Sequence, residues 1–140
     1  MQKLTIALSL TTLLLLTAAC SSNAGNNTGR VIRSQPIGNN LTVALSNEDG
    51  VLRNGDEEFF LTFTNASGRP VDVGAVALNF HMPAMGTMAV MNDPTTFTTT
   101  STPGVYRGRA HIEMAGEWQA QITYEGPAGS GRTSFPVTAQ

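Results

Sequence analysis

Two stretches near the C-terminus alternate apolar or small residues with polar residues over nine or ten positions, and this pattern constrains the fold most. Residues 105–114 place one set on one face, namely Tyr106, Gly108, Ala110, Ile112 and Met114. Residues 117–125 do the same with Trp118, Ala120, Ile122 and Tyr124. A period of two is typical of a strand with one buried face and one solvated face. The chain must therefore build a sheet over a one-sided core.

The remaining sequence also favours strands. Further strand signals lie at 41–45, 58–64, 71–80, 95–100 and 133–137. Turn chemistry separates them at 47–50, 65–70, 103–104, 115–116 and 127–131. No segment shows a sustained helical period with caps. We therefore predict an all-β fold, an immunoglobulin-like antiparallel β-sandwich of seven or eight strands. The predicted core comprises Leu41, Val43, Leu45, Phe59, Leu61, Phe63, Val76, Leu78, Phe80, Tyr106, Ile112, Trp118 and Ile122.

The N-terminus has the organisation of an export signal. Lys3 precedes an apolar run at 4–16, and small residues lead to Cys20, the single cysteine of the chain. The run resembles a bacterial lipoprotein signal, although Thr17 stands where leucine is usual. This organisation predicts a signal peptide at 1–19, a flexible tether at 20–30 with lipid on Cys20, and a β-domain at 31–140. An ordinary secretory signal that leaves a free thiol is the alternative.

Export and lipidation predict a location in the bacterial cell envelope, anchored to the membrane through Cys20. Because Ser21 is not the aspartate of inner-membrane retention, an anchor in the outer membrane, on the periplasmic or extracytoplasmic side, is favoured. Beyond Cys20 the positive charges are seven arginines against ten acidic residues, so the net charge there is about −3. The absence of a basic patch argues against nucleic-acid binding.

Four methionines recur at every third position directly after a histidine, in the segment His81-Met-Pro-Ala-Met-Gly-Thr-Met-Ala-Val-Met91. Thioethers are soft ligands and imidazole is a borderline one, a combination that suits Cu(I). Pro83 and Gly86 should interrupt a strand, so we expect a loop or an edge here. A regular strand would put Met82 and Met88 on one face, and Met85 and Met91 on the other. A polyproline-II path would instead line all four sulfurs along one side.

Both histidines are out of phase with their apolar neighbours and should point to solvent. If their strands were neighbours, the two imidazoles would converge beside the methionines. The candidate metal ligands are His81, Met82, Met85, Met88, Met91 and His111. Apolar packing is the alternative use of these methionines. Met82 continues the phase of Val76, Leu78 and Phe80, so it is the first candidate for burial, and Met114 should belong to the core.

Three blocks of the sequence together resemble the YtkA-like domain, which is related to FixH-like proteins. They are Phe80-His-Met-Pro-Ala-Met-Gly-Thr-Met, Pro103-Gly-Val-Tyr-Arg-Gly-Arg-Ala and Ile112-Glu-Met-Ala-Gly-Glu-Trp118. The resemblance covers about residues 40–138. It implies an immunoglobulin-like sandwich in an exported or membrane-tethered protein, with links to copper handling and respiratory oxidase assembly. Many members carry a histidine where this chain has Thr87.

No nucleophile elbow or phosphate-binding loop is present in the sequence, and Glu113, Glu117 and Glu125 should lie on a solvated face, so we do not expect an enzyme. We expect a Cu(I) chaperone or buffer that exchanges its ion with a copper acceptor, an efflux component or an oxidase. Two alternatives remain open. The methionine segment can serve as an apolar docking surface of an interaction module, or the chain can be a metal-free accessory subunit of an efflux or oxidase-assembly complex.

Overall fold

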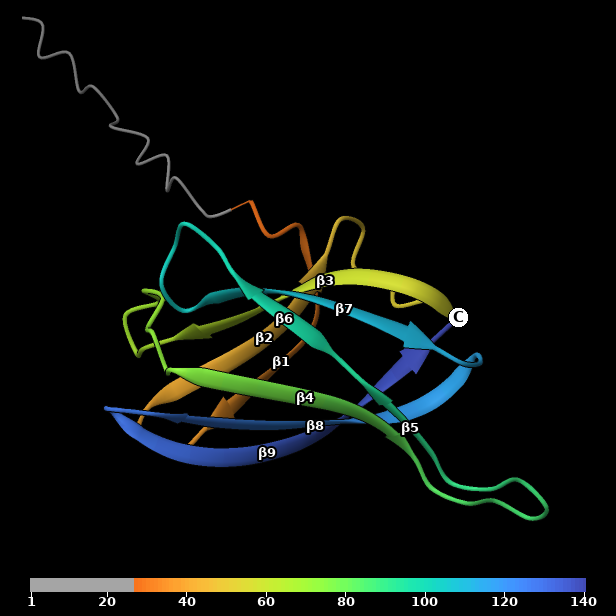
Figure 1. The fold of residues 1–140 in the computed structure, drawn as a ribbon. Helices are drawn as coiled ribbons and strands as arrows, with labels where there is room; N and C mark the ends of the chain where they lie inside the picture. Colours follow the sequence, from red (N-terminus) through yellow and green to blue (C-terminus); the bar gives the residue numbers. More distant parts are fainter. Residues whose placement is uncertain (1–26) are drawn as a thin grey trace, which may run out of the picture.

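A computed structural model describes residues 27–140, which form two antiparallel sheets (Figure 1). The strands are β1 (Arg30–Ile37), β2 (Leu41–Asn47), β3 (Gly55–Thr64), β4 (Ala75–Met82), β5 (Met91–Pro94), β6 (Thr96–Thr99), β7 (Val105–Ile112), β8 (Gly116–Gly126) and β9 (Gly129–Ala139). Within this span there is no helix long and apolar enough to cross a bilayer. The predicted signal peptide and Cys20 lie outside the described residues.

The two sheets have the strand orders β1-β2-β3-β7-β6 and β5-β4-β8-β9. The prediction of an all-β antiparallel sandwich is confirmed. Two strands were not predicted. β1 is an exposed edge strand whose pairing with β2 shifts register between Val31 and Arg33, so its side chains do not alternate cleanly. β5 is only four residues long and contains Pro94, which makes it too short for a clear sequence pattern.

The core lies between the two sheets and is rich in edge-to-face aromatic pairs. Phe59 of β3 meets Phe80 of β4 with 5.7 Å between ring centroids, and Phe63 meets Tyr124 of β8 at 5.5 Å. All the predicted core residues are buried except Leu41 and Val76, which are partly buried and pack against the core. Each large buried side chain contributes about 1.5–3 kcal/mol. Residues 27–140 thus contain both sheets and a continuous core, and form a self-contained folding unit.

Tyr106 and Gly108 of β7, and Gly104 just before this strand, pack closely against neighbouring residues. A Cβ on Gly108 would lie 2.6 Å from the ring of Phe59, so only a glycine leaves room for that ring. Gly104 has φ +86°, and a Cβ there would lie 2.5 Å from the carbonyl oxygen of Val71. The Tyr106 hydroxyl donates to the carbonyl oxygen of Gly74 at 2.9 Å. The glycines and the tyrosine at these positions therefore serve the packing of the fold.

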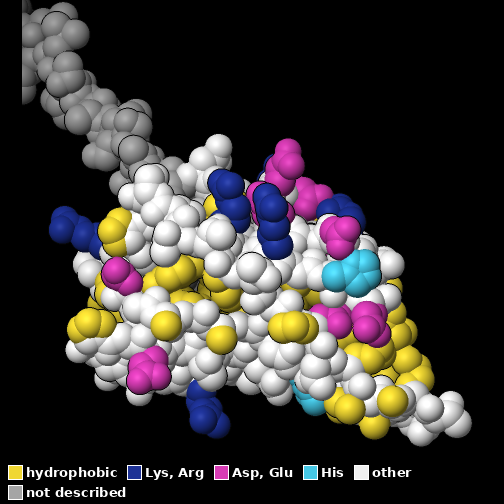
Figure 2. All heavy atoms as spheres, in the orientation of Figure 1, with side chains coloured by type: hydrophobic (Ala, Val, Ile, Leu, Met, Phe, Trp, Pro, Cys, Tyr) yellow, Lys and Arg dark blue, Asp and Glu magenta, His cyan; other side chains and the backbone are white. Residues whose placement is uncertain are grey.

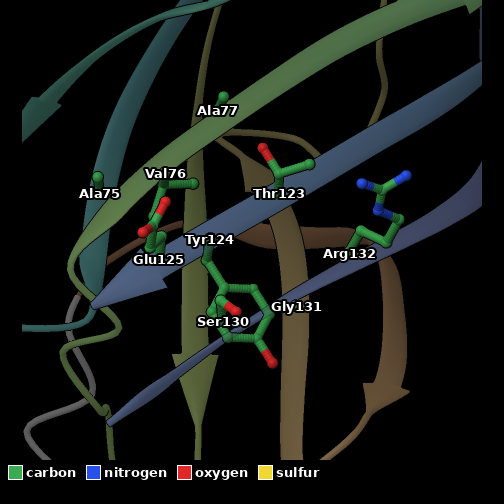
Figure 3. A pocket seen from close by; sticks show the side chains of 9 residues that line it. All are labelled: Ala75, Val76, Ala77, Thr123, Tyr124, Glu125, Ser130, Gly131 and Arg132. Carbon is green, nitrogen blue, oxygen red and sulfur yellow. The ribbon is translucent and has the colours of Figure 1, made fainter. Parts of the chain in front are cut away.

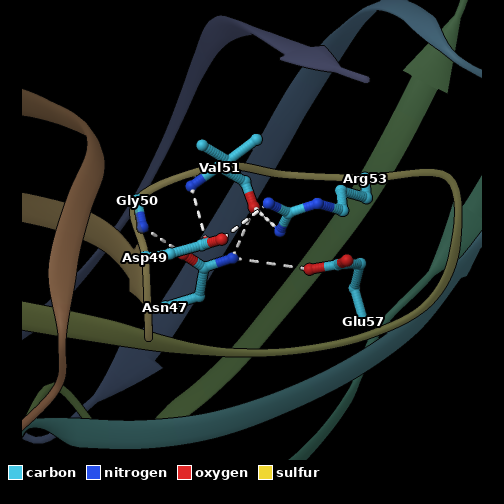
Figure 4. A network of polar contacts seen from close by, with 6 residues as sticks. All are labelled: Asn47, Asp49, Gly50, Val51, Arg53 and Glu57. Carbon is cyan, nitrogen blue, oxygen red and sulfur yellow. Dashed lines mark hydrogen bonds and ion pairs between the residues drawn. The ribbon is translucent and has the colours of Figure 1, made fainter.

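The loop between β2 and β3 has the turn chemistry predicted for residues 47–50 (Figure 4). The Asn47 side chain accepts from the Gly50 N–H and donates to the Val51 carbonyl oxygen, both at 2.7 Å. Arg53 pairs with Asp49 at 2.6 Å, and this hydrogen bond lowers the pKa of the Asp49 carboxyl group. Burial raises the pKa of Glu57 nearby. Asp49 is thus engaged in holding the shape of this loop.

Candidate metal centre

The methionine segment is the tip of the hairpin formed by β4 and β5, and it projects from the body of the sandwich (Figure 1). Met82 is paired with Met91 at the end of the ladder. Three residues further out, Met85 and Met88 form a bridge and exchange both backbone hydrogen bonds, at 3.2 and 2.9 Å. Gly86 and Thr87 make the turn, and Gly86 has φ +56°, which suits the first central position of a two-residue hairpin turn.

The spacing of three residues sorts the methionines into two opposed pairs with different surroundings. Residues an odd number of positions apart on one strand point to opposite faces. The burial agrees with this rule, because Met82 is 2% exposed whereas Met85 is 58% and Met88 is 39% exposed. Met91, opposite Met82, is partly buried and packs against the core. The inner pair belongs to the core and the outer pair is open to solvent.

This arrangement corrects two sequence predictions. The expectation that Met82 and Met88 share a face assumed one continuous strand, but the turn at Gly86 and Thr87 lies between them. The polyproline-II path is also wrong, because the segment doubles back as a hairpin. The expected interruption at Pro83 and Gly86 is confirmed, since the ladder ends at Met82 and resumes only as the isolated bridge.

His81 is half-buried on the outer face of the four-stranded sheet and is held by a side-chain amide. Its Nδ1 lies 2.9 Å from Oδ1 of Asn92, the residue opposite it on β5. The amide of Asn79 donates to the same oxygen at 2.9 Å and also lies 3.3 Å from Oε1 of Gln121. The imidazole is therefore oriented by a chain of three carboxamides that crosses three strands.

His111 is not brought to the methionines. It lies on β7 in the five-stranded sheet, whereas His81 lies on β4 in the other sheet, so their strands are not neighbours. The His111 Nδ1 pairs with Asp56 Oδ1 at 2.7 Å, and this hydrogen bond raises the pKa of the imidazole. The pair borders an open groove of about 540 Å³ that Glu58 and Arg109 also line. The condition under which the two histidines could converge, that their strands be neighbours, is therefore not met.

The hairpin tip presents two thioethers without any neighbouring charge in its own segment. Residues 83–90 are all exposed and none is charged. Figure 2 shows hydrophobic side chains gathered where this hairpin projects, while charged side chains gather over β3 and β7. Opposed residues of an antiparallel pair have Cβ atoms about 4.5–5.5 Å apart, and each methionine sulfur is two bonds beyond Cβ. Met85 and Met88 can therefore both approach one ion.

Other ligand types do not gather in this way: within residues 27–140, no three side chains of His, Cys, Asp or Glu form a group able to hold a metal ion.

A second concave feature lies at the opposite end of β4, on the β4-β8-β9 sheet (Figure 3). It encloses about 460 Å³ and owes its depth to small residues, among them Ala75, Ala77 and Gly131. Met82 lies seven residues after Ala75 along β4, a strand length of about 23 Å. This hollow is therefore distinct from the methionine tip.

Sequence reasoning missed Asn92 and the pairing of the methionines. Asn92 stood in a stretch without a visible strand pattern, so nothing marked it as the partner of His81. A usable signal for the hairpin was present: Gly86 and Thr87 lie at the centre of the segment, with the methionines placed symmetrically about them.

Most of the motif residues on which the family resemblance was based hold the fold together, and the others are exposed to solvent. Trp118 donates from Nε1 to the Met114 carbonyl oxygen at 3.1 Å and fixes the turn that leads to Gly116, the first residue of β8, which has φ +144°. Tyr106 and Gly108 of β7, with Gly104 just before it, are the closely packed residues described above. In the methionine motif, Met82 is buried and Met85 is exposed. Only the second methionine of that motif is open to a ligand.

Comparisons with known proteins place the chain in a family. The YtkA-like family matches residues 37–123, a span that runs from the end of β1 into β8. No curated protein and no solved structure matches the chain. Because the matched span exceeds half of the chain and contains the methionine hairpin, the β7 residues and the turn before Trp118, this protein belongs to the YtkA-like family.

Proposed function

We propose that this protein is an exported, lipid-anchored Cu(I) chaperone or buffer that holds its ion at the tip of the β4–β5 hairpin. The observation that supports the proposal is the exposed, opposed pair Met85 and Met88. Thioethers favour Cu(I) over hard cations, and an exposed site with few ligands suits an ion that must be passed on. The proposed role is one of binding and not of catalysis.

The proposed ligand set is smaller than the one predicted from the sequence. Met85 and Met88 are its centre, and His81 lies on the same hairpin. Met82 is a core residue, Met91 packs against the core, and His111 is paired with Asp56 in the other sheet. The copper acceptor would be an envelope protein of copper efflux or oxidase assembly, as the family resemblance implies.

The direct test is a competition titration of residues 27–140 with a colorimetric Cu(I) chelator. Wild-type protein should withhold one Cu(I) per chain, and Met85→Leu/Met88→Leu should weaken binding by about tenfold or more, equivalent to about 1.4 kcal/mol. Leucine keeps the volume of the side chain and removes the sulfur. The matched control is Met91→Leu/Met114→Leu, which removes two sulfurs from partly buried positions and should leave the affinity unchanged. Equal affinity of all three proteins would reject the site.

A second candidate function is supported by the same exposed tip. Val90 is 50% exposed beside Met88, and the uncharged segment 83–90 forms an apolar surface that can dock on another envelope protein. The two candidate functions predict different effects of replacing both exposed methionines by leucine. Docking through apolar area should survive the double leucine variant and fail in Met85→Ser/Met88→Ser, whereas Cu(I) binding should fail in both.

A further inference from the structure

The carboxamide chain on the outer face of the four-stranded sheet determines which nitrogen of His81 is available to a ligand. Asn92 Oδ1 is a carbonyl oxygen and can only accept, and it lies 2.9 Å from His81 Nδ1. A hydrogen bond between them therefore requires the proton on Nδ1. In the neutral ring this leaves Nε2 without a proton and with its lone pair free, which is the form that a metal ion binds.

The orientation of Asn92 is itself fixed by its neighbour. The Asn79 amide nitrogen donates to Asn92 Oδ1 at 2.9 Å and faces Gln121 Oε1 at 3.3 Å. One NH2 group thus serves two carbonyl oxygens, and the Asn92 oxygen receives donors from two sides. Such hydrogen bonds to the non-ligating nitrogen orient a histidine and set its tautomer in metal sites.

His81 also lies on the same face of the hairpin as the exposed thioethers. Positions 81, 83 and 85 share one face of their strand by alternation, and 92, 90 and 88 share the matching face of the opposite strand. Along a regular strand the Cα atoms of His81 and Met85 would be about 13 Å apart. The ladder is interrupted between Met82 and Met85, so fewer hydrogen bonds hold the tip to the sheet than hold the strands.

We propose that His81 supplies Nε2 as a further ligand to the cation held by Met85 and Met88, with the tip bending toward it, and that Asn92 is the positioning residue that sets its tautomer. The cation belongs to the soft monovalent class. The inference rests on the proposed function for the identity of the metal. The tautomer, however, is a property of the metal-free protein and is measured separately.

The first experiment is a long-range ¹H–¹⁵N spectrum of the imidazoles in metal-free residues 27–140, recorded where the rings are neutral. Wild-type His81 should carry its proton on Nδ1. Asn92→Leu should shift the proton toward Nε2, and Asn92→Asp, which keeps an accepting oxygen, should retain it on Nδ1. His111, whose Nδ1 partner is Asp56, is an internal reference that should not respond to either change. A wild-type His81 protonated on Nε2 would overturn the inference.

The second experiment adds Ag(I), an air-stable cation of the same soft class, to the same samples. Nε2 of His81 should shift strongly on binding, and Asn92→Leu should weaken Ag(I) binding about tenfold or more, the usual effect of removing such a partner. If Ag(I) binds through Met85 and Met88 while Nε2 does not shift, the role of His81 is refuted and the thioether site stands. If the double leucine variant binds Ag(I) as the wild type does, the proposed function itself fails.

Discussion

The hydroxyl group of Tyr106 donates to the carbonyl oxygen of Gly74 at 2.9 Å and lies 3.1 Å from Oδ1 of Asp72. Tyr106 belongs to β7 in the five-stranded sheet, whereas Gly74 directly precedes β4 in the other sheet. This contact therefore ties the two layers together at the start of the strand that leads to the methionine hairpin. Burial raises the pKa of Tyr106, so the hydroxyl stays protonated and remains a donor.

Tyr106→Phe should lower the free energy of unfolding by about 1–3 kcal/mol, because the partly buried Gly74 carbonyl loses its partner. Urea denaturation with an unchanged m-value is the measurement. Tyr124→Phe is the matched control, since the Tyr124 hydroxyl makes no hydrogen bond among residues 27–140. Similar losses in the two variants would show that the hydrogen bond to Gly74 contributes little to stability, because both changes keep the aromatic ring and remove only a hydroxyl.

Gly108→Ala should destabilise the domain by about 1–3 kcal/mol through overpacking. The new methyl group would lie 2.6 Å from the Phe59 ring, which is fully buried, and 2.9 Å from that of Phe97, which is partly buried against the core. Gly38→Ala is the control, because a Cβ there meets nothing within 4 Å. Thermal denaturation of both variants checks the prediction. Two equal midpoints would mean that the aromatic rings move aside at little cost.

Met82→Ala and Met85→Ala should differ sharply in stability although the two residues belong to one motif. Met82 is buried, so its truncation leaves a cavity and should cost about 2–5 kcal/mol. Met85 is exposed at the tip, and its truncation should change stability by no more than about 0.5 kcal/mol. Urea denaturation of the metal-free proteins separates the two. A large loss for Met85→Ala would indicate that the tip packs against the body.

Asp56→Asn should lower the pKa of His111, which the Asp56 carboxylate raises above its ordinary value of 6.5. A raised pKa in the folded state means that the pair stabilises the fold fully below the unfolded pKa and loses this contribution as pH rises through the folded pKa. The stability difference between wild type and Asp56→Asn should therefore shrink from acidic to alkaline pH. NMR titration of His111 measures the pKa, and thermal melts across pH measure the stability difference. An unshifted titration would contradict the pairing.

Cys20→Ala should move the protein from the membrane fraction of the cell to a soluble envelope fraction, because it removes the thiol proposed to carry the lipid. Fractionation and metabolic labelling with a fatty-acid analogue are the measurements. Ser21→Ala is the control and should remain labelled and membrane-bound. Persistence of Cys20→Ala in the membrane fraction would favour an uncleaved apolar segment in place of a lipid.

The strands that the sequence predicted best are those with one face in the core. β7 and β8 alternate cleanly because their inner residues pack between the sheets while Arg107 or Gln121 face solvent, and the period of two follows directly. β1 was not predicted from the sequence because it lacks such a buried face. It is an edge strand with mostly exposed side chains and a register shift, so its pairing is carried by the backbone and leaves little pattern.

The candidate site was only partly predictable. Ligand chemistry could be read from residue types, which singled out Met85, Met88 and His81 as candidate ligands. The directions of the side chains could not be read from the sequence, because they depend on where the chain turns. The tight turn at Gly86 pairs Met85 with Met88 at the exposed tip and Met82 with Met91 at the core. His111 is far from His81 because their strands join different sheets. Which sheet a strand joins depends on pairing between segments that are distant in the sequence. Asn92 lies opposite His81 through the same kind of pairing, here between β4 and β5.

If Met85 and Met88 hold an ion as proposed, the open end of the β4–β5 hairpin has a kinetic consequence for metal exchange. Two sulfurs on a projecting turn leave part of the coordination sphere of a bound ion accessible from outside. A receiving protein could then add its own donor before either sulfur departs, so that under the proposed function the ion would move through a shared three- or four-ligand state without release as a free species. Delivery from such a tip would be fast even where binding is tight, and its rate would depend on the concentration of the recipient.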